Sequence, residues 1–172
     1  MRIGLLIVDM QRLFMNEVAD KHRVAETCEY INYVSGLLRA AGQPVIHIQD
    51  MEGAQHDADP EARSIIPEVV VGPNDLRVEK EYSNAFWKTD LEQMLRDQGV
   101  EFVVVSGFSA EYCVTFTANG AAERGFPAAI LQRGILSANP DAVSSIYRDR
   151  HVVSHSVINY MTSVIGKTIA PE

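Results

Sequence analysis

The sequence has few cysteines and few positive charges. Only two of its 172 residues are cysteine, which excludes a disulfide-dense scaffold and a four-cysteine zinc site. Lysine and arginine number 15 against 23 aspartates and glutamates, so the formal net charge is −8. This balance argues against a nucleic-acid partner or an anionic membrane partner, because both require clustered positive charge.

Long apolar runs are also absent. The first apolar run, Ile3–Val8, ends at Asp9 and is too short for a secretory signal. No stretch reaches the roughly 18 apolar residues of a membrane helix. We therefore expect a cytoplasmic protein with reduced thiols. The length is typical of one domain, and we expect residues 1–172 to form it.

The apolar runs that do occur are continuous and rich in β-branched residues, which predicts strands covered on both faces, as in a parallel sheet. These runs are Ile3–Val8, Pro44–Ile48, Phe102–Val105, Ala128–Leu131 and the shorter Val152–Val153. Segments of helical period alternate with them, at 24–41, 89–98, 112–124, Asp141–Arg150 and Val157–Ile165. The alternation predicts a three-layer α/β/α fold with a mostly parallel, Rossmann-like sheet. The irregular stretch 50–78 is expected to be a long excursion near the site.

Ligands of an open parallel sheet bind outside the carboxyl ends of the strands, where Asp9 and Cys113 are expected. Asp9 directly follows the first predicted strand, and position alone leaves open a site carboxylate or a helix N-cap. Cys113 begins a helix, where the helix dipole favours a thiolate and free N–H groups can hold an oxyanion. A buried packing cysteine fits that position equally well. Cys28 lies on an apolar helix stripe and is interpreted as a packing residue.

Three ordered motifs resemble those of the isochorismatase-like cysteine hydrolases, a superfamily that includes nicotinamidases and N-carbamoyl amide hydrolases. The opening strand and its aspartate are matched by Leu6-Ile7-Val8-Asp9-Met10-Gln11 with Phe14. The lysine segment is matched by Lys80-Glu81-Tyr82-Ser83-Asn84-Ala85-Phe86 with Thr89 and Leu91. The nucleophile segment is matched by Gly107–Val114, then Thr117-Ala118 and 121–126. The resemblance spans nearly the whole chain. Without it, the charged run around Lys80 is typical of a solvated surface.

The resemblance implies a catalytic triad of Asp9, Lys80 and Cys113. In that triad Asp9 takes the thiol proton and Lys80 favours the thiolate. The backbone N–H groups of Ser109 and Cys113 are implied as the oxyanion hole, after a cis peptide bond between Phe108 and Ser109. The implied reaction is hydrolysis of an amide or carbamoyl C–N bond of a small molecule through a thioester acyl-enzyme.

The side chains around the three motifs are expected to form the substrate pocket. The residues assigned to it are Gln11, Phe14, Tyr82, Phe86, Trp87, Phe108 and Tyr112. We expect no cofactor and no metal. Nicotinamidases carry a metal set of the form Asp-x-His with a further His, whereas this chain has Asp50-Met51-Glu52 and His56, which we interpret as solvated loop residues. The strand after Gly125 reads Leu131-Gln132-Arg133-Gly134 in place of the family's Asp-Ala ending, which predicts an altered pocket or subunit interface.

Two other functions stay open. An isochorismatase-type ether hydrolase would keep the fold and cleave another bond, but such members of the siderophore and phenazine type lack the cysteine, so Cys113 favours an amide. A non-catalytic binding or scaffold protein would also keep the fold, and the intact set of Asp9, Lys80 and Cys113 argues against it. The resemblance alone implies a homo-oligomer, either a dimer or a tetramer. His151 and His155 are four residues apart, but we expect them not to share a helix face.

Overall fold

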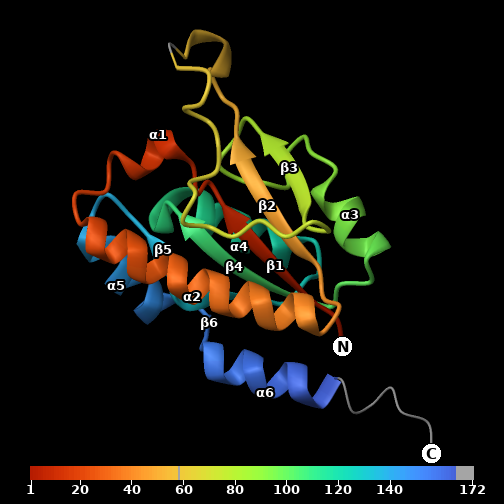
Figure 1. The fold of residues 1–172 in the computed structure, drawn as a ribbon. Coiled ribbons are helices and arrows are strands. Elements are labelled where there is room, and N and C mark those ends of the chain that lie inside the picture. The colour runs from red at the N-terminus through yellow and green to blue at the C-terminus, as the bar shows by residue number, and fades with distance from the viewer. Residues whose placement is uncertain (58, 166–172) are drawn as a thin grey trace, which may run out of the picture.

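The computed structural model describes residues 1–57 and 59–165, and Figure 1 shows their arrangement. Residues 58 and 166–172 of the predicted domain lie outside the described part. The strands are β1 (Ile3–Val8), β2 (Val45–Asp50), β3 (Leu76–Lys80), β4 (Phe102–Phe108), β5 (Ala128–Leu136) and β6 (Val152–Val153). The helices are α1 (Arg12–Met15), α2 (Lys21–Ala40), α3 (Leu91–Asp97), α4 (Thr115–Glu123), α5 (Pro140–Asp149) and α6 (His155–Ile165). A 3₁₀ turn, η1 (Ala54–His56), and a π-helical turn, η2 (Ala110–Val114), complete the regular structure of the described residues.

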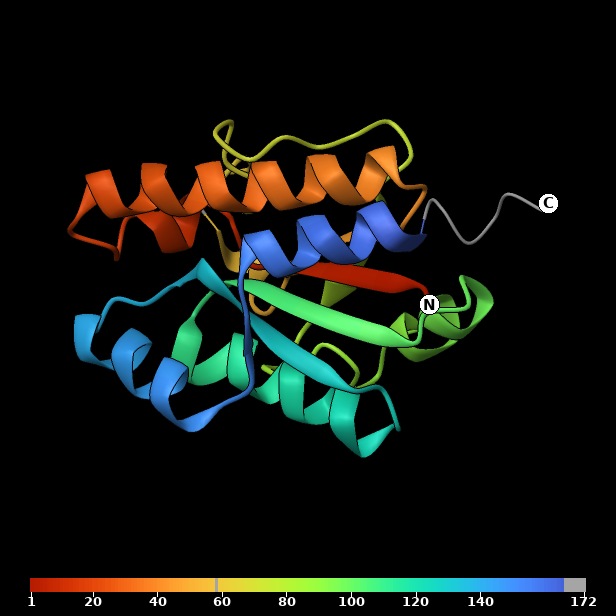
Figure 2. The same ribbon diagram turned by 90° about the horizontal axis from the view of Figure 1, so that it is seen from below.

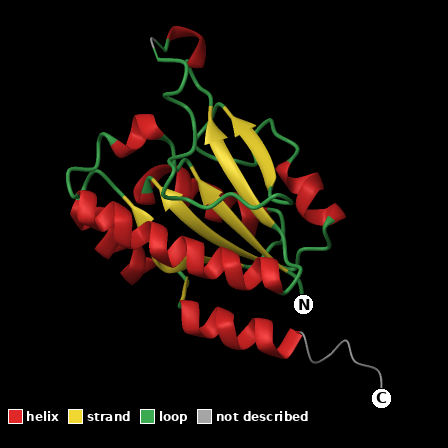
Figure 3. Cartoon of the chain, viewed as in Figure 1, coloured by secondary structure: helices red, strands yellow, loops and turns green. Residues whose placement is uncertain are grey.

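The strands form one parallel sheet in the order β3-β2-β1-β4-β5-β6. Helices cover both faces: α2 and α6 lie on one side, and α3, α4 and α5 lie on the other (Figure 2). Each side has its own apolar core, and alternate residues of β1 and β4 contribute to each. The predicted three-layer α/β/α fold is therefore confirmed. Figure 3 shows how the loops at the carboxyl ends of the strands gather at one edge of the sheet. None of the described helices is long and apolar enough to span a bilayer.

The strand order reverses between β1 and β4. From β1 the chain moves outward through β2 to β3, then returns to β4 and moves outward on the other side to β5 and β6. Ligands of open α/β sheets bind at such a reversal, outside the carboxyl ends of the strands. The two central strands come very close there, because a Cβ atom at Gly107 would overlap the carbonyl oxygen of Val8. Gly107 also has a φ of 107°, which suits glycine.

Three differences from the sequence prediction lie near the site. The strand β3 was missed, because its residues alternate between exposed charges and buried side chains and therefore read as a charged run. The strand β5 continues past Leu131 to Leu136, with a register shift against β4. Cys113 lies in the π-helical turn that precedes α4, so the helix predicted from residue 112 begins at Ala110.

Candidate active site

The three residues of the predicted triad meet at the carboxyl edge of the sheet. Asp9 directly follows β1, Lys80 ends β3, and Cys113 lies in the π-helical turn after β4. The Nζ atom of Lys80 is 2.9 Å from Oδ2 of Asp9 and 3.4 Å from Sγ of Cys113. Lys80 is only 2% exposed, so it is not the solvated side chain that its charged neighbours indicate.

A fourth residue, Asp50, belongs to the same group and was not predicted. It ends β2 and pairs in register with Lys80 on β3, and its Oδ2 lies 2.7 Å from Lys80 Nζ. Asp50 is 8% exposed, which corrects the interpretation of a solvated loop residue, whereas Glu52 and His56 are exposed. Its position at a strand end, like that of Asp9, was the signal that could have identified it.

This group of carboxylates could hold a cation. One ligand atom from each of Asp9, Asp50 and Cys113 lies within 4.8 Å of the others. The Lys80 ammonium contacts all three residues and already occupies the position between them. A bound metal ion would have to displace a buried ammonium. The donor set therefore fits a protein-supplied cation better than a metal.

The electrostatics of the group follow from burial. Burial raises the pKa of Asp9 to about 6, although the Lys80 ammonium opposes the shift. Burial, together with the adjacent Asp9 carboxylate, raises the pKa of the Cys113 thiol to about 12. The Lys80 ammonium favours the thiolate, as expected, but burial and Asp9 outweigh its effect on the thiol pKa. Burial alone would lower the pKa of Lys80, but the attraction of Asp9 and its other neighbours raises it instead, so the ammonium stays charged.

The backbone resolves the two interpretations of Asp9. The N-cap of α1 is Gln11, and its side chain makes no capping bond, so Asp9 does not cap this helix. Asp9 has a φ of 50°, in the left-handed region that few residues other than glycine adopt. Its N–H donates to the Ile48 carbonyl oxygen at 2.9 Å. The Oδ1 atom of Asp9 is buried and has no hydrogen-bond partner among the described residues.

The two predicted oxyanion donors, the N–H groups of Ser109 and Cys113, lie in the segment that follows β4. The peptide bond between Phe108 and Ser109 is cis, as the resemblance implied. The Ser109 carbonyl oxygen accepts hydrogen bonds from the N–H groups of Tyr112 and Val114, both at 3.1 Å. In the part of the chain that the structure describes, no acceptor is found for the Ser109 N–H. That N–H is therefore available to a ligand, as an oxyanion donor must be.

A cavity of about 210 Å³ opens beside Cys113. The predicted site residues that line it are Asp9, Phe14, Phe108, Ser109, Tyr112 and Cys113. It is also lined by Glu17, Asp50, Glu111 and Ala138, which the sequence did not single out. The rings of Phe14 and Phe108 stack with their centroids 5.6 Å apart. The volume lies below the roughly 300–1,000 Å³ typical of sites for drug-sized ligands, so a small substrate fits best.

Gln11 was assigned to the pocket but has a structural position instead. It is fully buried, and its amide Nε2 donates to the carbonyl oxygens of Asp50 and Arg63 at 3.1 and 2.8 Å. Its Oε1 accepts from the Asp50 N–H at 2.8 Å. Gln11 thus fixes the backbone of Asp50 from both sides.

Three aromatic residues assigned to the pocket also lie elsewhere. Phe86 is buried in the core and stacks on Phe126, while Tyr82 and Trp87 are exposed and do not line the cavity beside Cys113. The segment that carries them is tied to the helix after Cys113, because the Ala85 N–H donates to Thr117 Oγ1 at 3.1 Å. The lysine motif and the nucleophile motif are therefore joined by this hydrogen bond as well as by the contact between Lys80 and Cys113.

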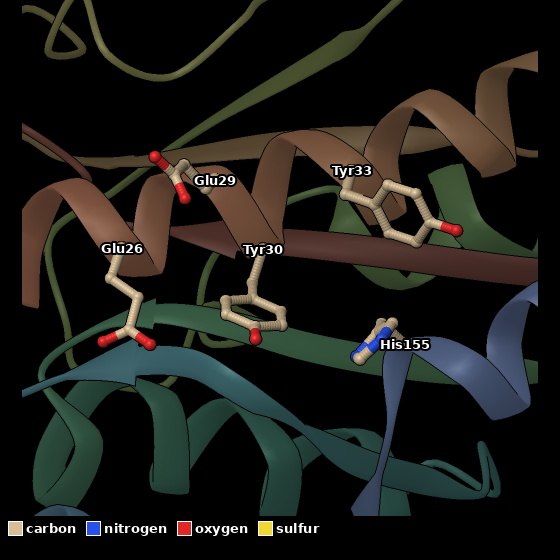
Figure 4. Close-up of a pocket in the computed structure, with 5 residues that line it drawn as sticks. All are labelled: Glu26, Glu29, Tyr30, Tyr33 and His155. Carbon is tan, nitrogen blue, oxygen red and sulfur yellow. The ribbon is translucent and has the colours of Figure 1, made fainter.

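A second hollow, of about 420 Å³, lies between α2 and α6 (Figure 4). It is lined by Glu26, Glu29, Tyr30, Tyr33 and His155. The ring of His155 lies 5.4 Å from that of Tyr30 and 5.7 Å from that of Tyr33. His155 begins α6 whereas His151 precedes β6, so the two histidines do not share a helix. This hollow holds no nucleophile and is separate from the cavity beside Cys113.

A family model and a full-length relative both match the chain to the isochorismatase family. The isochorismatase domain family model matches residues 4–167. The isochorismatase family protein YecD of Escherichia coli O157:H7 is 27% identical over 184 residues, covering 98% of this chain and 92% of that protein. The streptothricin hydrolase of Streptomyces noursei is 34% identical over 129 residues, covering 71% of this chain and 45% of that protein. The structure of N-carbamoylsarcosine amidase from Thermoplasma acidophilum is 22% identical, with a TM-score of 0.74 and coverage of 90% of this chain and 95% of that one.

Proposed function

Because the chain belongs to the isochorismatase family of hydrolases, we propose that it is a cysteine-dependent amidohydrolase that cleaves an amide or carbamoyl C–N bond of a small molecule. The observation that carries the proposal is the contact of Lys80 Nζ with both Asp9 and the Cys113 sulfur, beside a cavity lined by Asp9 and Cys113. The names of two similar proteins, a streptothricin hydrolase and an N-carbamoylsarcosine amidase, support hydrolysis of this bond class.

Asp9 acts as the general base. With a thiol pKa of about 12 for Cys113 and a carboxyl pKa of about 6 for Asp9, the proton rests on sulfur at neutral pH. A free thiolate is therefore scarce, and proton transfer to Asp9 accompanies the attack of sulfur on the substrate carbonyl carbon. The Oδ1 atom of Asp9 is buried and has no hydrogen-bond partner among the described residues, so we assign it as the oxygen that takes this proton.

Lys80 supports the charges that form during this step. Its ammonium stays protonated and contacts Asp9, Asp50 and the sulfur. The negative charge on the carbonyl oxygen is stabilised by the N–H groups of Ser109 and Cys113, and losing one donor of this type typically costs about 10²–10³ in rate. The sequence resemblance assigns these two donors, and the available Ser109 N–H supports the assignment.

Collapse of the tetrahedral intermediate completes acylation. The C–N bond breaks, and the leaving nitrogen takes the proton held by Asp9, so ammonia or an amine departs and a thioester on Cys113 remains. Asp9 then accepts a proton from water as the water oxygen attacks the thioester carbonyl. The C–S bond breaks, the carboxylic or carbamic acid is released, and the sulfur recovers its proton.

A substrate panel tests the proposed reaction. Primary amides, carbamoyl compounds and isochorismate should be incubated with the native chain, with release of ammonia or amine and loss of substrate as readouts. We expect C–N cleavage of at least one amide or carbamoyl compound. Cleavage of isochorismate with all the amides untouched would replace the proposal with the ether hydrolase. Failure of every member would favour the non-catalytic protein.

A further inference from the structure

The charged residues that line the cavity beside Cys113 are all acidic. Four of its lining residues, Asp9, Glu17, Asp50 and Glu111, are carboxylates, and none of the described residues that line it is Lys, Arg or His. The Lys80 ammonium is fully buried and already contacts Asp9 and Asp50, so it is not free to bind an anionic group of a substrate. Arg63 also pairs with Asp50, at 3.6 Å. Among the described ion pairs, Glu17 and Glu111 are therefore the two lining carboxylates without a cationic partner.

Among these carboxylates, Glu111 is held in place by the protein without a cation. The Ser109 hydroxyl donates to its Oε2 at 2.6 Å, and the Ser137 hydroxyl donates to its Oε1 at 2.8 Å. Ser137 is in turn fixed, because its Oγ accepts from the Asn139 N–H at 2.8 Å. No cationic side chain forms an ion pair with Glu111 in the described part of the chain.

The placement of Glu111 suits recognition rather than proton transfer. It precedes Cys113 by two residues in the π-helical turn, and its serine partner Ser137 directly follows β5. Asp50 and Lys80 come from the other side of the reversal, at the ends of β2 and β3. Glu111 therefore reaches the cavity from a different element than the buried ammonium does. Its carboxylate is fixed by two hydroxyls whose geometry orients both oxygens.

The aromatic walls of the cavity favour the same ligand charge. Phe14 and Phe108 stack on each other at the cavity, and Tyr112, which is 59% exposed, also lines it. The faces of such rings attract cations. A fixed carboxylate, further acidic groups and aromatic surfaces together make a site for a positively charged group. The same set repels a carboxylate.

We infer that the substrate of the proposed hydrolase is a small amide or carbamoyl compound that carries a cationic nitrogen group, and that Glu111 is the residue that recognises this group. The inference rests on the proposed function for the identity of the scissile bond. Amides that carry a carboxylate close to the scissile bond, and dianions such as isochorismate, are disfavoured because they would bring further negative charge into a cavity lined by Glu17 and Glu111.

Thiol labelling with charged reagents tests the charge preference without requiring turnover. In a Cys28→Ala background, Cys113 is the only cysteine. Its sulfur attacks 2-aminoethyl methanethiosulfonate, which is cationic, or 2-sulfonatoethyl methanethiosulfonate, which is anionic, forming a disulfide and releasing methanesulfinate. The ratio of the two rates is compared with the same ratio for a small free thiol. We expect the ratio for Cys113 to exceed that reference by about tenfold at low salt and to fall as salt rises.

The variant Glu111→Gln identifies the residue responsible. Glutamine can keep hydrogen bonds to both serines while removing the charge, so the ratio should fall several-fold toward the small-thiol value. The matched control is Glu123→Gln, which makes the same substitution on the exposed end of α4 and should leave the ratio unchanged. A native ratio equal to the reference would overturn the inference. A preference unaffected by Glu111→Gln would overturn the role of Glu111.

A matched set of amides separates this inference from the proposed function. The set contains 4-aminobutanamide, pentanamide and succinamate, which are similar in length and are cationic, neutral and anionic. We expect the cationic member to have the highest kcat/KM, and Glu111→Gln to reduce its advantage mainly through KM. Equal or better hydrolysis of the anionic member would overturn the inference and leave the hydrolase proposal intact. If none is cleaved, the labelling ratio still decides whether the site prefers cations.

Discussion

The ammonium nitrogen of Lys80 lies 3.4 Å from the sulfur of Cys113, although β3 and β4 are separated in the sheet by two other strands. The lysine side chain crosses the carboxyl ends of β2 and β1. The residues at those ends are Asp50 and Asp9, and both form ion pairs with the crossing ammonium. The strand order thus places two compensating carboxylates along the path of a buried charge, which a buried lysine requires.

The two cysteines should differ in reactivity. Cys28 is a residue of α2, is 2% exposed and packs in the apolar core, and burial raises its pKa to about 12. Cys113 has a similar pKa but is partly exposed, lines a cavity and faces a carboxylate that can take its proton. Iodoacetamide at neutral pH should therefore label Cys113 much faster than Cys28, as measured by peptide mass spectrometry. Equal, slow labelling of both would contradict a nucleophilic role.

Activity should have an acid limb set by Asp9. The carboxylate must be unprotonated to accept the thiol proton, and its pKa is raised to about 6. The rate should therefore fall as the pH drops through about 6, measured as kcat/KM with a substrate that does not titrate in this range. Asp9→Asn cannot accept the proton and should be inactive. A flat profile down to pH 4.5 would remove Asp9 as the base.

The raised pKa of Asp9 also makes the stability of the fold fall as the pH rises. Because the folded-state pKa of Asp9 lies above the unfolded value of 3.8, the folded chain binds this proton more tightly than the unfolded chain. The stabilising contribution of this group is complete below the unfolded pKa and is lost as the pH rises through about 6. Asp9→Asn, which cannot titrate, should show less of this pH dependence in urea unfolding. Identical pH dependence in the variant and the native chain would contradict the assignment.

Removing the buried ammonium should destabilise the fold. Lys80→Met keeps an unbranched side chain, shorter by the terminal atom, but leaves two carboxylates, Asp9 and Asp50, buried side by side without the ammonium. Loss of one partner of a buried ion pair costs about 3–5 kcal/mol, and we expect this loss at pH 8 in urea unfolding. The loss should shrink toward pH 5, because protonation of a carboxylate relieves the repulsion. The control Lys88→Met removes an exposed ammonium and should change stability little.

The close approach of β1 and β4 predicts a steric effect at Gly107. A Cβ atom there would overlap the Val8 backbone, which cannot move without shifting the neighbouring Asp9. Gly107→Ala should therefore destabilise the chain by several kcal/mol. Gly125→Ala is the matched control: Gly125 also has a positive φ, but a Cβ atom there meets nothing within 4 Å, so the cost should be only about 1–2 kcal/mol. Equal losses in thermal unfolding would contradict the steric explanation.

The sequence predicted the central strands and their loops because their signals are local. Continuous apolar runs marked β1 and β4, and the residues that follow them, Asp9 and Cys113, were therefore placed at the carboxyl edge. Lys80 was different. It ends an edge strand with one solvated face, so its surroundings read as a charged run, and only the motif resemblance assigned it a role.

The rest of the site depends on contacts between distant residues. Asp50 was missed because its partner, Lys80, is 30 residues away and becomes a neighbour only through the pairing of β2 with β3. The Glu111–Ser137 hydrogen bond spans 26 residues and depends on the length of β5, which the sequence underestimated. Gln11 and Phe86 belong to the motifs but are buried and do not line the cavity, because membership of a motif does not fix which way a side chain points.

Turnover by Cys113→Ala tests most directly whether Cys113 is the nucleophile. The measurement is the initial rate of C–N cleavage of any compound that the native chain hydrolyses, with folding of the variant checked by circular dichroism. We expect a folded variant whose rate falls at least about 10³-fold, because only binding and oxyanion stabilisation remain. A folded variant that cleaves the same bond at the native rate would contradict the nucleophilic role of Cys113.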